Sequence, residues 1–423
     1  MQYLNKKDLA YYSGAKVIKK KFKQYNSIGT EELKAVRKVI KSGKLSSFIA
    51  GNLEGGFYVQ KFEKYLEKFY KVKHAVSVNS WTSGLICAVG ALDIEPGDEI
   101  ITTPWSMCAS ATSILHWNAI PVFADISKKD FCIDPKSIRD KISRKTKAIL
   151  AVDIFGRSCK IDEIKKITMG TNIKIITDSA QSPYSFYQNK ITGTISDVGG
   201  FSLNYHKHIH TGEGGVLVTN DSVIAKRLKL IRNHAEAYSY FKKNSDLQNM
   251  LGFNFRMGEI EASIGIEQYK KLKNILKKRN KILNFLTLNL KDLKGLELPE
   301  INLDFNHNFY IYPLVLNLEK IPYSRKFIFQ CLQAEGVQGL NEGYSNIHLL
   351  PLFQKKIAYG KSGFPWSVYN KHINYKKGIC PNAEELHEKS FIGIEVCLFD
   401  FSAKDVLNIA HAFKKVWKCL GIY

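Results

Sequence analysis

Short apolar strands that alternate with helical segments between residues 30 and 260 constrain the fold of this chain more than any other feature. Segments such as 99–102, 147–152 and 173–177 are rich in isoleucine and lack the alternation of a strand with one solvated face. Strands of this kind are buried on both faces, which is typical of a parallel sheet covered by helices. The pattern therefore predicts an α/β domain with a mainly parallel sheet.

The pattern changes near residue 257, where Met257–Leu290 predicts a long helix, or a helix with a break, that leaves the first domain. We expect three parts: an N-terminal arm (1–29), a large domain (30–260), and a smaller C-terminal α/β domain that includes the connecting helix (261–423). A helix expected to begin at residue 30 would be capped by Thr30. The last helix is predicted to begin at Ser402, because Ser402 and Asp405 have capping-box spacing.

Composition narrows the class of partner. The net charge of +23 favours an anionic partner, but the lysines are spread along the chain, and no nucleic-acid-binding motif accompanies the one dense cluster, Lys19–Lys23. We expect an anionic small molecule and no nucleic acid. No apolar run approaches the roughly 20 residues of a membrane span, so we expect no membrane partner and a cytoplasmic location. The eight cysteines form no Cys-x-x-Cys pair, which argues against a zinc site or a disulfide framework.

The first candidate site segment, Asn79–Gly84, lies between a short apolar strand (75–78) and a helix expected at about 82–92. Free backbone N–H groups and the helix dipole favour an anion at such a junction. The hydroxyls of Thr82 and Ser83 could add hydrogen bonds to a phosphate. Serine and threonine also cap many helices that bind nothing, so this segment alone leaves both interpretations open.

The other candidate residues follow two later strands. Asp178 stands at the C-terminal end of strand 173–177, the edge at which ligands bind in open α/β sheets, and an aspartate there can hold a pyridine nitrogen protonated. Lys207 lies in a polar loop between an apolar strand that ends at Ser202 and a Gly-rich turn, Thr211–Gly215. A lysine on a braced, partly desolvated loop can be unprotonated and nucleophilic, as a Schiff-base lysine requires.

These segments and a fourth, Gly252–Met257, resemble in order and spacing the DegT/DnrJ/EryC1/StrS family of sugar aminotransferases, over roughly residues 25–420. The resemblance implies the fold-type I architecture of aspartate aminotransferase, with a mostly parallel seven-stranded sheet in the large domain. It implies pyridoxal 5'-phosphate (PLP) as the cofactor and a homodimer with shared active sites. The implied reaction moves an amino group, usually from glutamate, to a keto group of a nucleotide-linked sugar, in the biosynthesis of amino sugars for surface polysaccharide or related glycans.

The resemblance also implies roles for single residues. Lys207 would hold PLP covalently and move the proton between substrate and cofactor. Asp178 would pair with the pyridine nitrogen, and Gln181 would lie near the phenolic oxygen of the ring. Asn254 would reach the phosphate of the neighbouring subunit. The other phosphate ligands would be Thr82, Ser83 and Ser202, and the candidates for contact with substrate are His206, His208, His210, Tyr344 and His348.

The sequence departs from the family pattern in two places. The family usually has glycine or another small residue where Trp81 stands. It also often places an aromatic residue over the cofactor ring, and that position falls on Met107, with Trp105 two residues earlier. Both Met107 and Trp105 are therefore candidates for contact with the cofactor, and Trp105 is equally well explained as a core residue.

A sugar dehydratase or epimerase, a regulatory protein and a metal site are the alternatives to a sugar aminotransferase. Some relatives are dehydratases with histidine in place of the lysine, but a five-residue step from Ser202 reaches Lys207 and neither neighbouring histidine. Dehydration or epimerisation is therefore the second hypothesis, and a non-enzymatic regulatory protein on this scaffold is the third. A metal site built from His206, His208 and His210 lacks nearby cysteines, and we expect no metal. The sequence does not identify the sugar, its nucleotide or the amino donor.

Overall fold

The computed structural model describes residues 5–49, 51–236, 251–301 and 306–423. Within them, seven strands form one sheet in the order β1-β9-β8-β5-β4-β2-β3, and only β9 runs antiparallel to its neighbours. The predicted mostly parallel, seven-stranded sheet is confirmed. Its strands are β1 (His74–Val78), β2 (Glu99–Thr102), β3 (Ile120–Phe123), β4 (Thr146–Val152), β5 (Lys174–Asp178), β8 (Val198–Ser202) and β9 (Gly215–Thr219).

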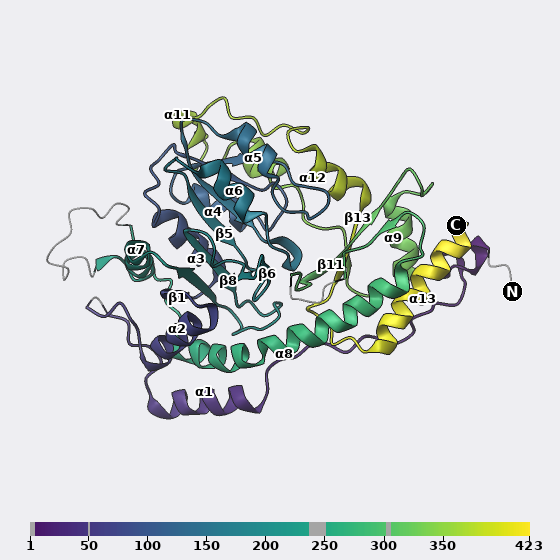
Figure 1. The fold of residues 1–423 in the computed structure, drawn as a ribbon, viewed down its shortest axis with the longest axis horizontal. Coiled ribbons are helices and arrows are strands. Elements are labelled where there is room, and N and C mark those ends of the chain that lie inside the picture. The colour runs from purple at the N-terminus through teal and green to yellow at the C-terminus, as the bar shows by residue number, and fades with distance from the viewer. Residues whose placement is uncertain (1–4, 50, 237–250, 302–305) are drawn as a thin grey trace.

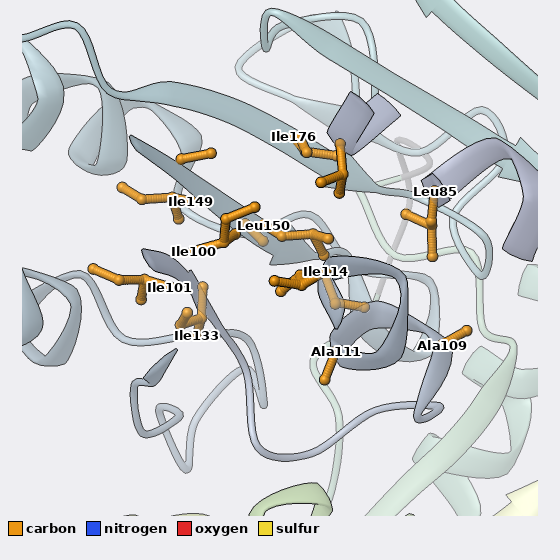
Figure 2. Close-up of a cluster of buried hydrophobic side chains, with 14 of the residues drawn as sticks. Leu85, Ile100, Ile101, Ala109, Ala111, Ile114, Ile133, Ile149, Leu150 and Ile176 are labelled. Atoms are coloured by element: carbon orange, nitrogen blue, oxygen red, sulfur yellow. The ribbon is translucent and has the colours of Figure 1, made fainter. Parts of the chain in front are cut away.

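Helices cover both faces of this sheet, as the unbroken apolar strands require (Figure 1). Figure 2 shows part of the resulting core, in which Ile100 and Ile101 of β2, Ile149 and Leu150 of β4, and Ile176 of β5 pack with helix residues. The helices of this part are α1 (Thr30–Ser42), α2 (Phe57–Tyr70), α3 (Trp81–Gly90), α4 (Ala109–Leu115), α5 (Pro135–Lys141), α6 (Ile161–Thr168) and α7 (Ser222–Arg232), and a small hairpin joins β6 (Phe186–Tyr187) to β7 (Lys190–Ile191).

The long predicted helix is α8 (Glu259–Leu290), and it is unbroken. It runs along the large domain and continues to the second, smaller sheet, where it packs against α13 (Figure 1). Within the described residues that sheet has four antiparallel strands in the order β10-β11-β13-β12. Its strands are β10 (Leu296–Glu297), β11 (Ile311–Leu316), β12 (Leu340–Asn341) and β13 (Phe391–Glu395), and α9 (Arg325–Ala334) and α13 (Ala403–Leu420) share its hydrophobic cluster. The helices α10 (Pro351–Gln354), α11 (Trp366–Tyr369) and α12 (Pro381–Glu385) instead contribute to the core of the large sheet.

The two predicted helix caps differ in outcome. Ser402 caps α13, and Ser402 and Asp405 exchange hydrogen bonds as a capping box, which confirms that prediction. Thr30 is the first residue of α1 and not its cap. The cap is Gly29, whose N–H donates to the Glu32 carboxylate at 2.8 Å, because a first-turn glutamate can satisfy this free donor.

The described part of the N-terminal arm (residues 5–29) packs against the second domain. Leu9, Ile18 and Phe22 are buried in the same hydrophobic cluster as α9 and α13. The division into arm, large domain and small domain stays a prediction. Among the described residues, no helix is long and apolar enough to cross a membrane.

The strand directions bring four chain segments to one edge of the large sheet. Since β9 is antiparallel to both β1 and β8, strands β1 and β8 point the same way as β5. The segments that follow β1, β2, β5 and β8 therefore leave the sheet at the same side. These segments contain the start of α3, the start of α4, Asp178 and the loop of Lys207.

Candidate active site

Lys207 lies in the loop that joins the antiparallel neighbours β8 and β9. Backbone hydrogen bonds close this loop: Leu203 N–H donates to Gly214 at 2.9 Å, and Thr211 N–H donates to Leu203 at 3.0 Å. The lysine is only 8% exposed, and its Nζ lies 4.2 Å from the centre of the Tyr310 ring. Burial lowers the pKa of Lys207 to about 8, against the opposing influence of Cys397, Asp178 and Glu395. A neutral, nucleophilic amine is therefore accessible near neutral pH.

Asp178 is buried at the end of β5, and hydrogen bonds fix its carboxylate from two sides. Oδ1 accepts from the indole Nε1 of Trp81 at 2.6 Å and from Ala180 N–H at 3.2 Å. Oδ2 accepts from the Ser110 hydroxyl at 2.8 Å. Burial raises the pKa of Asp178, and the bonds from Ser110 and Trp81 and the charge of Lys207 oppose that rise. The carboxylate is thus held in one orientation close to the lysine.

Residues of the small domain complete the surroundings of Lys207. Gln181 accepts from Phe155 N–H at 2.7 Å and donates through Nε2 to the Tyr344 hydroxyl at 3.0 Å. Burial raises the pKa of the nearby Tyr310 hydroxyl, and Tyr344 adds to that rise. Burial raises the pKa of Glu395, at the end of β13, and the charge of Lys207 opposes that rise. A chain of polar groups therefore joins the large-domain and small-domain sides of the lysine.

The proposed phosphate ligands surround the start of α3. The structure gives the capping role to Ser80, whose Oγ accepts from Ser83 N–H at 3.1 Å. The Thr82 side chain is exposed, whereas Ser83 is buried with its hydroxyl 2.9 Å from that of Ser80. The hydroxyl of Ser202, at the end of β8, accepts from Asn204 N–H at 3.3 Å. Because Ser80 takes over the cap, the Thr82 hydroxyl and the first N–H groups of α3 can serve an anion.

Asn254 lies beside the same helix start of its own chain. The Asn79 side chain donates to the Asn254 carbonyl at 3.3 Å, and Arg256 donates to the Asn254 side chain at 2.8 Å. The Asn254 side chain is exposed, as a residue that acts across a subunit interface has to be.

Of the two candidates for contact with the ring, Trp105 is fully buried. It packs edge-to-face against Phe155 and Phe391, and its Nε1 donates to the Tyr344 carbonyl. Met107 is 51% exposed, and its sulfur accepts from Ala109 N–H at 3.1 Å. The core interpretation of Trp105 is the one that its packing supports, and we no longer propose it as a cofactor contact.

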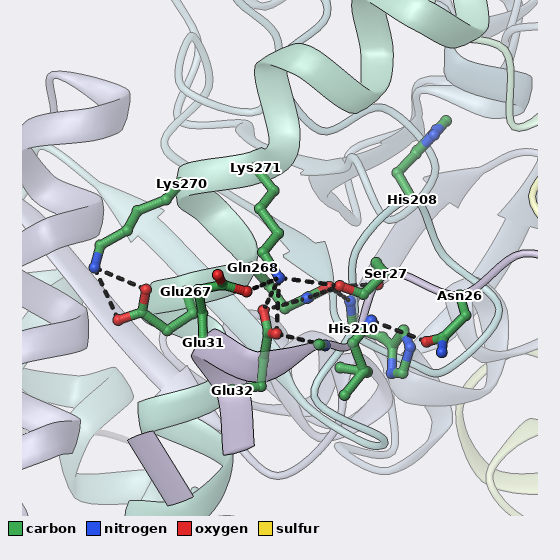
Figure 3. Close-up of polar contacts among 12 residues, drawn as sticks. Asn26, Ser27, Glu31, Glu32, His208, His210, Glu267, Gln268, Lys270 and Lys271 are labelled. Carbon is green, nitrogen blue, oxygen red and sulfur yellow. Dashed lines mark hydrogen bonds and ion pairs between the residues drawn. The ribbon is translucent and has the colours of Figure 1, made fainter. Parts of the chain in front are cut away.

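The three histidines of the lysine loop point to different partners. His206 is half-buried, and burial together with Lys207 lowers its pKa to about 4. His208 is fully buried and contacts Arg279 of α8 and Cys397. Figure 3 shows His210 apart from His208, beside the segment of Ser27. Because the loop is not a strand, the residues do not share one face. No group of three metal-ligating side chains occurs within the described residues.

His210 joins a network that anchors the loop to α8 (Figure 3). Its backbone N–H donates to Gln268 Oε1 at 3.3 Å, and the Gln268 amide donates to Glu32 at 2.7 Å and to the Ser27 carbonyl at 3.0 Å. Lys271 donates to the second oxygen of Glu32 at 2.7 Å. These bonds brace the lysine loop from behind.

The last candidate, His348, is fully buried and hydrogen-bonded to Glu384 at 3.0 Å. Glu384 also accepts from Gly378 N–H at 2.8 Å, so the pair holds the turn before α12. We therefore no longer propose His348 or His208 as substrate contacts, because both are fully buried and a protein side chain holds one ring nitrogen of each.

The sequence analysis did not single out Ser110, Tyr310 and Glu395. Ser110 follows β2 at the same sheet edge as Asp178, and that position is a signal that could have found it. Tyr310 and Glu395 come from the second sheet, and no local motif marks them.

A buried lysine near a fixed aspartate, at the strand ends of a seven-stranded sheet beside a helix start, defines a fold-type I PLP enzyme. Residues 26–382 match the DegT/DnrJ/EryC1/StrS aminotransferase family. The chain belongs to that family, as predicted, and PLP is its cofactor.

Three similar proteins illustrate the range of the family. The chain is 31% identical to the spore coat polysaccharide biosynthesis protein SpsC of Bacillus subtilis, over 80% of this chain and 86% of that protein. The structure of Helicobacter pylori PseC, an aminotransferase involved in pseudaminic acid biosynthesis, is 28% identical with a TM-score of 0.77, over 94% and 99% of the two chains. That of Escherichia coli GDP-4-keto-6-deoxy-D-mannose-3-dehydratase with bound hydrated PLP is 25% identical with a TM-score of 0.77, over 93% and 99%.

Proposed function

We propose that this protein is an aminotransferase that moves an amino group from glutamate to a keto group of a nucleotide-linked sugar. The product would be an amino sugar for surface polysaccharide or a related glycan. The observation that carries the proposal is the position of Lys207, whose Nζ is buried between Tyr310 and the carboxylates of Asp178 and Glu395. The neighbouring His206 faces the same Tyr310 ring from a half-buried position, and the His208 ring is held by Arg279.

Bound PLP supplies an electrophilic carbon and a ring that withdraws electrons from the reacting carbon. Lys207 would attach the cofactor through Nζ and, once released, carry a proton at Nζ. Asp178 would hold the pyridine N–H. Thr82, Ser83, Ser202 and the first N–H groups of α3 would bind the phosphate. Gln181 would orient the ring from the side of Tyr344.

Three of the predicted substrate contacts remain as candidates. His206 and Tyr344 lie in the surroundings of Lys207, and His210 lies further from the lysine. The net charge of +23 favours a substrate with a diphosphate handle. The relatives named above act in polysaccharide and nucleotide-sugar pathways, which supports a nucleotide-activated hexose as the first choice.

Dimerisation would complete the site. Ile49, Phe57 and Leu251 are each more than 60% exposed, at 67%, 67% and 61%. The Ile49 carbonyl accepts from Asn233, which pairs with Asn254, so Ile49 adjoins the residue proposed to act in the partner's site. Exposed apolar residues of this kind are typical of a subunit interface. The cytoplasmic location stays a prediction.

The proposed reaction is tested by incubating the holoenzyme and glutamate with a panel of nucleotide-linked keto-sugars, with detection of products by mass. Formation of an aminated sugar and 2-oxoglutarate is the expected result. A product that has lost water without gaining nitrogen would instead establish the dehydratase alternative. A chain that takes up no PLP would favour the regulatory alternative.

The shared site is tested by mixing two inactive variants, Lys207→Ala and Asn254→Ala. A mixed dimer would contain one site with both native residues, and half of the dimers are mixed after random exchange of equal amounts, so the mixture should regain up to about a quarter of the native activity. If the mixture stays inactive while subunits exchange, Asn254 does not act across the interface.

A further inference from the structure

Trp81 occupies a space that three glycines leave for it. The family usually has a small residue at this position, yet the Trp81 side chain is only 6% exposed. A Cβ atom at Gly200 of β8 would lie 2.3 Å from the indole ring, and one at Gly84 would lie 2.8 Å from it. A Cβ at Gly215 would lie 2.8 Å from the Trp81 backbone. The indole therefore has a defined place between α3 and the sheet.

In that place the indole reaches Asp178. Nε1 is the only polar group of tryptophan and can only donate, and it donates to Oδ1 at 2.6 Å. The Ser110 hydroxyl occupies one acceptor position on Oδ2. A carboxylate oxygen can accept about two hydrogen bonds, so Oδ2 keeps the capacity for another donor. Donors to a buried carboxylate favour its ionised form, and here they oppose the raising effect of burial on the pKa of Asp178.

We infer that Trp81 is a positioning residue for the cofactor: its indole N–H holds Oδ1 of Asp178, so that the carboxylate stays ionised and offers Oδ2 to the N–H of the pyridine ring. This inference rests on the proposed roles of Asp178 and Lys207. It adds a residue that the family pattern leaves small, and it predicts that the effect of Trp81 passes through the ring nitrogen alone.

The test is the dissociation constant of PLP for the apo-protein, measured from the visible band of the bound cofactor. Trp81→Phe keeps an apolar ring but removes the N–H. We expect PLP to bind about tenfold more weakly, which corresponds to about 1.4 kcal/mol. A PLP analogue with CH in place of the ring nitrogen should bind native protein and Trp81→Phe with dissociation constants within about twofold of each other.

Two further variants separate this role from packing. Trp117→Phe is the matched control, because Trp117 is equally buried and its Nε1 donates at 2.7 Å to the Ile86 carbonyl, away from Asp178. Its PLP affinity should equal that of the native protein. In an Asp178→Asn background, Trp81→Phe should change PLP affinity by less than about twofold, because the two residues would act as one unit.

Equal losses for PLP and the analogue, or the full loss in the Asp178→Asn background, would overturn the inference and leave Trp81 a packing residue. An unchanged affinity for PLP would overturn it as well. If Trp81→Phe fails to fold, replacement of Trp81 by β-(3-benzothienyl)alanine keeps the bicyclic shape without the N–H, and the same results are expected. Native protein that forms no visible band with PLP at Lys207 would refute the proposed cofactor site itself, which is a distinct outcome.

Discussion

Two walls face Lys207, and they differ in how the chain builds them. The large-domain wall contains Asp178, the last residue of β5, and Gln181, three residues later, together with the hydroxyl groups at the start of α3. The small-domain wall contains Tyr310, Tyr344 and Glu395, which come from the second sheet or from the loop after β12. The first wall consists of residues at strand ends that lie at one edge of the large sheet. The second wall belongs to a separate sheet, and its position beside that edge depends on the path of α8. We expect the first wall to govern the cofactor and the second to govern substrate and proton transfer.

The largest expected effect is that of Lys207→Ala, because Lys207 is proposed to act both in cofactor binding and in proton transfer. Loss of Nζ removes the covalent attachment of PLP and the group that carries the proton. Turnover should fall below detection, and the visible band of the covalently bound cofactor should disappear. Borohydride treatment of the native protein followed by peptide mapping should label Lys207. Lys356→Ala is the control, since the Lys356 amine contacts only a backbone carbonyl among the described residues.

Asp178→Asn should weaken the function of the large-domain wall, which concerns the cofactor, and leave that of the small-domain wall unchanged. An amide of the same shape cannot pair as an anion with the pyridinium, and loss of one partner of a buried ion pair costs about 3–5 kcal/mol. We expect kcat to fall roughly a hundredfold or more, and PLP to bind more weakly, while the KM for the keto-sugar changes little. An Asp178→Asn enzyme with near-native kcat would show that the aspartate has no electronic role.

The contrast between the walls also explains what the sequence could predict. Asp178, Lys207 and the α3 start each follow a recognisable apolar strand, so local patterns locate them and the common strand direction brings them together. Glu395 lies at the end of a short strand, and its approach to Lys207 depends on the register of β11 against β13 and on the path of α8, none of which a local pattern contains. The helix from residue 30 was predicted at its correct start, but its cap is Gly29 and not Thr30, and α3 begins at Trp81 after its cap Ser80, one residue before the expected start. The burial of His208 and His348 also lies outside what a local pattern contains, because it depends on contacts with Arg279 and Glu384 that are distant in sequence.

Glu395→Gln removes a negative charge from the small-domain wall and should thereby change the pKa of Lys207. The pKa of Lys207 is lowered to about 8 by burial, and the negative charge of Glu395 counteracts that effect. Below this pKa the amine is protonated and does not attack PLP, so the rate of PLP attachment should rise as the pH increases through it. Removal of the Glu395 charge disfavours protonation, and the midpoint should move to lower pH. Stopped-flow measurement of the visible band between pH 6 and about 9.5 gives the midpoint.

A matched control for this shift is Glu342→Gln. Glu342 is 46% exposed in its side chain and pairs with Arg325 at 2.6 Å, so it belongs to the same domain without facing Lys207. Its variant should keep the native midpoint. A midpoint that rises in Glu395→Gln would contradict the proposed electrostatic coupling between Glu395 and the lysine.

Tyr344→Phe should produce the smallest effect, and it tests whether the walls are separable. The Tyr344 hydroxyl accepts from Gln181 at 3.0 Å, so this hydrogen bond links the two sides. Loss of one neutral hydrogen bond costs about 1 kcal/mol, or roughly fivefold. We expect kcat/KM for the keto-sugar to fall about fivefold, with PLP affinity within about twofold of native.

Tyr312→Phe is the control for that prediction, because the Tyr312 hydroxyl bonds to Thr287 at 2.7 Å inside the other hydrophobic cluster. It should lower the free energy of unfolding by about 1 kcal/mol without changing kcat/KM. If Tyr344→Phe weakens PLP binding as much as it lowers kcat/KM, then Gln181 transmits the change to the ring. The two walls would in that case act as one unit, joined by the hydrogen bond between Gln181 and Tyr344.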